Sequence, residues 1–135
     1  MRNIFSVIGA VFLIILFQCT SKENANSSIE GSWNAEWLLM DNSLADIYPP
    51  ENLIMNGEIL FNPSNSANIK AFGYEGCVFA SDTAENELKY EFTDSLLNLI
   101  NDNNEVVFSY LIKERLTNQI SLEMMEDIKL TLRRQ

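Results

Sequence analysis

The chain has 135 residues, 19 acidic against 9 basic side chains for a formal net charge of −10, and no histidine. This acidic balance repels phosphate backbones and argues against a nucleic-acid partner, and the lack of histidine removes the commonest general base and the commonest metal ligand. The length suits a single domain with its own core.

A secretory signal is predicted at the amino terminus. Arg2 gives a positive start, and residues 4–17 contain one polar side chain, that of Ser6. A helix of this length rises about 21 Å, short of the ~30 Å hydrocarbon core of a bilayer. Export followed by cleavage is therefore expected in place of a membrane span.

The end of this segment resembles a bacterial lipoprotein signal. Leu16-Phe17-Gln18-Cys19 is similar to the lipobox of that family. The resemblance implies a signal peptide over residues 1–18 and a diacylated, palmitate-type modification of Cys19. It also implies anchoring in the cell envelope, on either the periplasmic or the surface face of an outer membrane. Residues 19–29, which contain the polar run 20–28, are then a flexible tether. A disulfide between Cys19 and Cys77, or an uncleaved signal anchor, are the alternatives.

The remaining chain, residues 30–135, is predicted to be all-β. Polar breaks at roughly ten-residue spacing indicate consecutive hairpins, and residues 42–56 are expected to form a long loop with one helical turn at 43–47. Apolar side chains recur at every second position, as strands with one buried face require, over residues 33–39, 59–61, 88–93, 106–113, 120–124 and 128–133. The breaks fall at residues 63–66, 93–95, 101–104, 114–115 and 125–127.

Seven to nine short strands in chain order predict an up-and-down antiparallel β-barrel of about eight strands. A sheet of that many strands avoids exposed edges by closing on itself. A β-sandwich with the same strand count is the alternative.

The two ends of this predicted barrel resemble the lipocalin family, in the compact form found in small bacterial lipoproteins. Gly31-Ser32-Trp33 is similar to the G-x-W motif, and Arg133-Arg134 ends the last predicted strand. In that family the tryptophan closes the barrel floor, and a basic residue of the final strand stacks across it. The resemblance implies that Gly31 and Trp33, with Arg133 or Arg134, close this barrel. A guanidinium over an indole face contributes about 0.5 to 2 kcal/mol.

The interior of the barrel is the candidate binding site. An eight-stranded barrel is just wide enough to be filled by side chains or to hold one small ligand. A pocket is expected at the end opposite Trp33, with Tyr48, Pro49 and Pro50 as a lid. Six aromatic residues in the inward phase are expected to line it: Trp37, Phe61, Tyr90, Phe92, Phe108 and Tyr110.

No residue pattern predicts catalysis, a metal site or a cofactor. The carboxylates fall mostly in the polar phase of the strands, and Cys77 has no activating neighbour, so it is expected to be a small buried residue on a strand. The oxygen-rich run 101–105 invites a calcium site. It lacks the glycine and the distant glutamate of an EF-hand loop, and a hairpin turn is expected instead.

The predicted function is therefore non-enzymatic binding by a monomeric, lipid-anchored envelope protein. The ligand is a small hydrophobic molecule or a protein partner. The alternative is a structural or assembly lipoprotein with a filled barrel that contacts another envelope protein.

Overall fold

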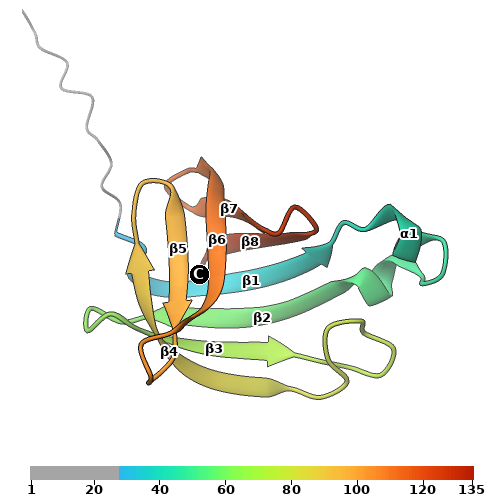
Figure 1. The fold of residues 1–135 in the computed structure, drawn as a ribbon, viewed down its shortest axis with the longest axis horizontal. Coiled ribbons are helices and arrows are strands. Elements are labelled where there is room, and N and C mark those ends of the chain that lie inside the picture. Colours follow the sequence, from blue (N-terminus) through green and yellow to red (C-terminus); the bar gives the residue numbers. More distant parts are fainter. Residues whose placement is uncertain (1–27) are drawn as a thin grey trace, which may run out of the picture.

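The computed structural model describes residues 28–135, so the predicted signal peptide, Cys19 and the tether up to residue 27 lie outside the described residues. The described chain forms one closed barrel in which eight antiparallel strands neighbour one another in chain order (Figure 1). This confirms the up-and-down barrel over the sandwich. The strands are β1 (Gly31–Leu39), β2 (Ile54–Phe61), β3 (Ser66–Phe72), β4 (Ala84–Phe92), β5 (Leu96–Ile100), β6 (Val106–Arg115), β7 (Gln119–Met124) and β8 (Ile128–Arg134).

Closure of the barrel comes from pairing of the first strand with the last. β1 pairs with β2 on one side and with β8 on the other, and Trp33 lies opposite Arg134 in the β1–β8 register. β5 and β6 cross β1, β2 and β3 at a steep angle (Figure 1). The eight-strand closed architecture is compatible with a lipocalin-like fold.

The core lies inside this barrel because side chains alternate between the two faces of a strand. In β2, Met55, Ile59 and Phe61 are buried, whereas Asn56 and Glu58 are exposed. The inward phase of β1 holds Trp33, Ala35 and Trp37. Period-two patterning in the sequence thus translates directly into one apolar interior.

The up-and-down order sorts the connections into two ends. The loops 40–53, 73–83, 101–105 and 125–127 gather at one end, called the open end here. The turns 62–65, 93–95 and 116–118 lie at the opposite or closed end, together with residues 28–30 and the carboxyl terminus. Among residues 28–135, no helix is both long and apolar enough for a membrane span.

The longest loop, 40–53, projects beyond the barrel (Figure 1). It contains α1 (Asn42–Ala45) and the 3-10 helix η1 (Pro50–Leu53). Asp41 begins α1 by accepting a hydrogen bond from the Ser43 amide at 2.8 Å, as N-cap residues do. Residues 54–56 belong to β2, so the loop predicted to reach residue 56 ends earlier.

Two further sequence expectations are wrong at particular positions. A break was expected at residues 114–115, but β6 continues through Arg115 and the chain reverses at 116–118. The register shifts between Ile112 and Glu114, and such a bulge interrupts the alternation from which strand ends are read. Cys77, expected on a strand, lies in the loop 73–83.

Candidate functional site

Trp33 forms the floor of the barrel at the closed end. Its side chain is only 1% exposed, and its indole Nε1–H donates to the carbonyl oxygen of Ile29 at 2.7 Å. The sequence predicts Ile29 to belong to the tether, but in the structure it packs into the core with 2% exposure. The segment before β1 therefore crosses the barrel end.

Arg134, and not Arg133, covers the Trp33 ring. The Arg134 guanidinium carbon lies 4.3 Å from the ring centroid, and its Nη1 and Nη2 donate to the carbonyl oxygens of Glu30 and Ser28 at 3.0 and 3.1 Å. One guanidinium thereby ties the last strand to the segment that precedes the first.

Of the other two residues predicted to close the barrel, Gly31 lies next to Arg134, whereas Arg133 does not cover the Trp33 ring. Arg133 points to the outer surface, where its Nη1 lies 3.8 Å from Glu36. Gly31 has a φ of +114°, and a Cβ there would lie 3.1 Å from Nη1 of Arg134. A glycine fits because other residues rarely adopt this conformation.

Three of the six aromatic residues predicted to line a ligand pocket belong to the closed end instead. Phe61 and Tyr90 pack edge to face with centroids 5.0 Å apart, and the Tyr90 hydroxyl donates to the carbonyl oxygen of Asn62 at 3.1 Å. Burial, aided by the charge of Glu30, raises the pKa of Tyr90. The ring of Phe92 lies under the Arg115 guanidinium, 4.6 Å from centroid to carbon. These rings fill the lower barrel.

An apolar cavity of about 300 Å³ occupies the upper barrel, toward the open end. All eight strands and one loop contribute to its wall, and none of the residues that line it is charged. Asn86, Tyr110 and the indole nitrogen of Trp37 supply its polar side-chain groups. The lining residues are Trp37, Met55, Ile59, Ile69, Ala71, Phe79, Asn86, Leu88, Leu99, Phe108, Tyr110, Met124, Ile128 and Leu130.

Trp37 and Tyr110 form a polar contact across the cavity wall. The indole Nε1–H of Trp37 donates to the Tyr110 hydroxyl at 3.4 Å. Burial raises the pKa of Tyr110, and this hydrogen bond acts in the opposite direction. The neutral phenol is thus the form that the cavity favours.

Gly57 makes room for the Trp37 ring. It faces inward on β2, and a Cβ built at this position would lie 2.7 Å from a ring carbon of Trp37 and closer still to the Lys70 carbonyl oxygen. The absent side chain therefore sets where the indole lies and, with it, the shape of the cavity.

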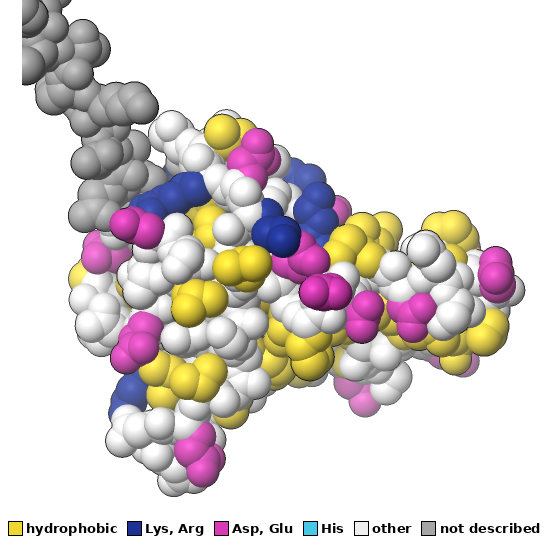
Figure 2. Space-filling model, turned by 45° about the horizontal axis from the view of Figure 1, so that its top comes forward, with side chains coloured by type: hydrophobic (Ala, Val, Ile, Leu, Met, Phe, Trp, Pro, Cys, Tyr) yellow, Lys and Arg dark blue, Asp and Glu magenta, His cyan; other side chains and the backbone are white. Residues whose placement is uncertain are grey.

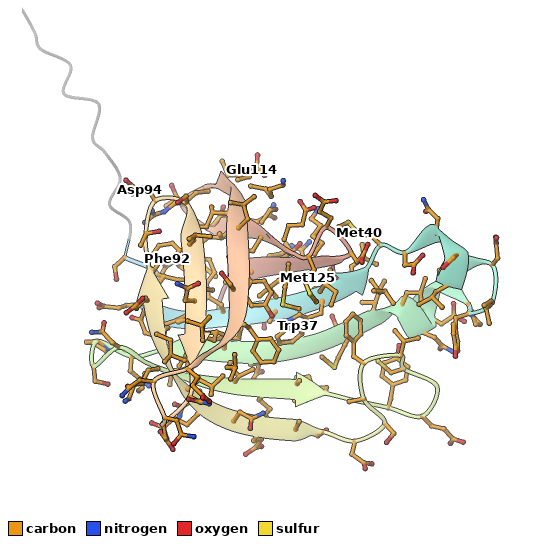
Figure 3. All side chains as sticks on the ribbon, in the orientation of Figure 1. Trp37, Met40, Phe92, Asp94, Glu114 and Met125 are labelled. Carbon is orange, nitrogen blue, oxygen red and sulfur yellow. The ribbon has the colours of Figure 1, made fainter. Side chains whose placement is uncertain are left out.

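Exposed hydrophobic side chains surround the mouth of the cavity. Phe108 lines the cavity and is still 43% exposed, and Met125, between the lining residues Met124 and Ile128, is 75% exposed. Trp37, Met40 and Met125 lie on one side of β6, whereas Phe92, Asp94 and Glu114 lie toward the closed end (Figure 3). Such a rim is typical of a site that takes up an apolar group.

Two larger hollows, of about 520 and 500 Å³, lie elsewhere and are lined mainly by polar and charged residues. The first follows the outer face of β2, β3 and β4, and the second lies beside Phe92 and Arg115 at the closed end. Their walls lack the continuous apolar surface that ligand pockets typically have. The cavity inside the barrel is therefore the better candidate site.

The other candidates from the sequence lie outside the cavity. Cys77 is half-buried, and its Sγ lies 3.9 Å from the Ile54 carbonyl oxygen. Its pairing with Cys19 falls outside the described residues. Tyr48, Pro49 and Pro50 are exposed and are not among the lining residues, so they do not form a lid here.

Residues 101–105 form the hairpin turn between β5 and β6. The Asn101 side-chain oxygen accepts from the amides of Asn103 and Glu105, both at 3.0 Å. Within residues 28–135, acidic and cysteine side chains are not grouped in a way that could hold a metal ion.

Sequence reasoning found three residues of the cavity wall, Trp37, Phe108 and Tyr110, and missed its aliphatic majority. Met55 and Leu130 are in the inward phase of their strands, so alternation could have identified them. Phe79 comes from the loop 73–83, for which the sequence carries no such signal. Comparison with known proteins finds no matching family model and no similar curated sequence, so the likeness to lipocalins is one of architecture.

Proposed function

We propose that this protein binds a small hydrophobic ligand in its barrel, as a lipid-anchored protein of the cell envelope. The observation that carries the proposal is the cavity of about 300 Å³ with an uncharged, mainly aliphatic and aromatic wall. Ligand sites in proteins are typically concave and apolar, with a few polar groups that orient the ligand. Asn86, the Tyr110 hydroxyl and the indole nitrogen of Trp37 are the polar groups available here.

The cavity size indicates the size of ligand. An engineered apolar cavity of about 150 Å³ accommodates benzene, so about 300 Å³ corresponds to roughly ten to twelve carbon atoms. The wall offers a phenol and an amide in place of an acid and base pair, which supports binding rather than catalysis.

The anchor is proposed to attach at the closed end. Ser28 and Glu30 lie beside Arg134 at the barrel floor. Nine residue steps separate Cys19 from Ser28, which span at most about 30 Å when extended. An acylated Cys19 would therefore hold the floor near the membrane and leave the mouth directed away from it.

Tryptophan quenching provides a direct test, because the chain contains two tryptophans and only Trp37 lines the cavity. The full chain is reconstituted in phosphatidylcholine vesicles and titrated with a ten-carbon alcohol that carries a terminal bromine, a contact quencher of indole fluorescence. Saturable quenching is expected. A Trp37→Phe variant, which retains Trp33, should lose it.

A pair of matched variants tests whether the cavity is the site. Ala71 lines the cavity, whereas Asn68 of the same strand is exposed on the outer face. Ala71→Phe adds a ring that takes up about half of the volume, scaled from the benzene cavity, and should weaken binding about tenfold or more. Asn68→Phe adds the same ring outside and should change binding less than about twofold, since an outward side chain does not reach the interior. Equal effects would locate the binding elsewhere.

The exposed rim favours a second candidate, an assembly lipoprotein whose rim contacts another envelope protein. Ile47 and Met125 are the most exposed large hydrophobic residues described. A native mass spectrum of the purified chain distinguishes the two functions. A retained hydrophobic molecule supports the first, and an empty barrel with a stoichiometric protein partner supports the second.

A further inference from the structure

The four loops of the open end carry carboxylates and no cationic side chain. The loop 40–53 has three acidic residues, and each of the other three loops has two, so nine of the 19 acidic residues lie in the loops of the open end. In Figure 2 the projecting part of the molecule shows acidic and hydrophobic side chains together, while Lys and Arg lie over the rest. The nine are Asp41, Asp46, Glu51, Glu75, Asp82, Asp102, Glu105, Glu126 and Asp127.

These carboxylates are not neutralised by ion pairs within the described chain. The ion pairs among residues 28–135 join Lys70 to Glu85, Lys113 to Glu123 and Arg133 to Glu36, all on strands. A cation does contact these loops, because the Lys89 ammonium donates to the side-chain oxygen of Asn104 at 3.0 Å. The four loops together still carry a net negative charge, and a mouth of one sign concentrates ligands of the opposite sign.

The charge lies immediately beside the cavity. Met124 and Ile128 line the cavity, and Glu126 and Asp127 lie in the turn between them. The main chain of this turn is held by a hydrogen bond from the Met40 amide to the Asp127 carbonyl oxygen at 2.6 Å. An apolar chain inside the cavity would thus place its polar end among carboxylates.

From this arrangement we propose that the ligand is a cationic amphiphile, a single apolar chain or ring system with an amine head group. The inference rests on the proposed function, because it assigns a chemical class to the occupant of the same cavity. The apolar part enters the uncharged interior, and the ammonium group stays at the acidic mouth. A fatty carboxylate of the same length would place its charge in a repulsive field.

Three brominated ten-carbon probes that differ only in the head group test this assignment. The amine and the carboxylic acid are both ionised near neutral pH, and the alcohol is the uncharged reference. The full chain in phosphatidylcholine vesicles is titrated with each probe, and quenching of Trp37 gives the affinity. At about 10 mM salt the amine should bind about tenfold or more tighter than the acid, with the alcohol between them. At about 1 M salt the difference should shrink below about threefold, since the Debye length falls to ~3 Å.

Two charge-matched double variants locate the effect. Glu126→Gln with Asp127→Asn removes two charges at the mouth, and Asp94→Asn with Glu114→Gln removes two at the closed end (Figure 3). One carboxylate about 7 Å from an ammonium in water changes the affinity about two- to threefold. The mouth variant should therefore weaken binding of the amine about fivefold, measured against the uncharged alcohol, and the closed-end variant less than about twofold.

The outcomes separate this inference from the function beneath it. If none of the three probes quenches Trp37, the binding function fails and the inference fails with it. If the probes bind with equal affinity, or the acid binds more tightly, binding stands and the cationic assignment is overturned. A salt-sensitive preference for the amine that both double variants reduce equally would reflect net charge alone, and would also overturn it.

Discussion

Removal of the Arg134 guanidinium should lower the free energy of unfolding more than the same change at the neighbouring Arg133. Arg134→Met keeps the apolar stem and deletes the guanidinium that lies 4.3 Å from the Trp33 ring and donates to two backbone carbonyls. The cation–π contact contributes about 0.5 to 1 kcal/mol at an exposed site. Two exposed hydrogen bonds contribute about 0.5 to 1 kcal/mol each. The expected loss is about 1.5 to 3 kcal/mol.

Arg133→Met is the matched control. Arg133 is adjacent on β8, is also exposed, and has an ion pair of 3.8 Å with Glu36. Exposed pairs of this kind contribute about 0 to 1 kcal/mol, so this variant should lose less than about 1 kcal/mol. The two variants change net charge equally, and the difference between them isolates the contact at the barrel floor.

Urea unfolding of the full chain in phosphatidylcholine vesicles, followed by tryptophan emission, measures both free energies. Because Trp33 lies at the floor, Arg134→Met should also shift its emission in the absence of urea. Arg134→Lys, which retains a charge but not the two-pronged donor, should recover at most half of the loss. Equal unfolding free energies for the Arg133 and Arg134 variants would refute the assignment of closure to Arg134.

Three other changes have expected outcomes. Gly57→Ala should lower the free energy of unfolding by about 1 to 3 kcal/mol through overpacking, and it should weaken probe binding because the new Cβ displaces the ring of Trp37. Urea unfolding measures the first effect and the quenching assay measures the second. Wild-type values in both assays would contradict the packing argument. The raised pKa of Tyr110 means that the folded state holds the phenol proton more tightly than the unfolded state, so the stabilising contribution of the neutral phenol is present below the ordinary pKa of 10.0 and is lost as pH rises above that value. Between pH 8 and 11, the free energy of unfolding should therefore fall less steeply in Tyr110→Phe than in the wild type. Parallel curves for the two proteins would refute this expectation. Cys19→Ser should abolish labelling by radioactive palmitate and release the protein from membranes, and persistent labelling would exclude Cys19 as the acylated residue.

The barrel was predictable because its signal is local. Alternation along β1, β4 and β8 is written in adjacent residues, and polar breaks mark most of the turns. β6 shows where this fails, because the bulge between Ile112 and Glu114 changes which residues face inward without any mark in the composition.

The candidate site was predictable only in part. Trp37 and Phe61 are both inward aromatic residues near a strand end, and the sequence pattern predicts that both line the pocket. In the barrel, Trp37 belongs to the end of β1 that reaches the cavity, and Phe61 to the end of β2 that packs against Tyr90. Which end a residue occupies depends on strand direction and register, and these are properties of the assembled sheet.

The sequence by itself determined the all-β character, the strand order and the acidic composition, because period two and charge are properties of neighbouring residues and of simple counts. Only the tertiary structure decided that Arg134 rather than Arg133 covers Trp33, and that the interior is filled at one end and hollow at the other. It also placed the carboxylates of four separate loops at the same end of the barrel. These features depend on contacts between residues far apart in the chain, and closure of the sheet brings those residues together.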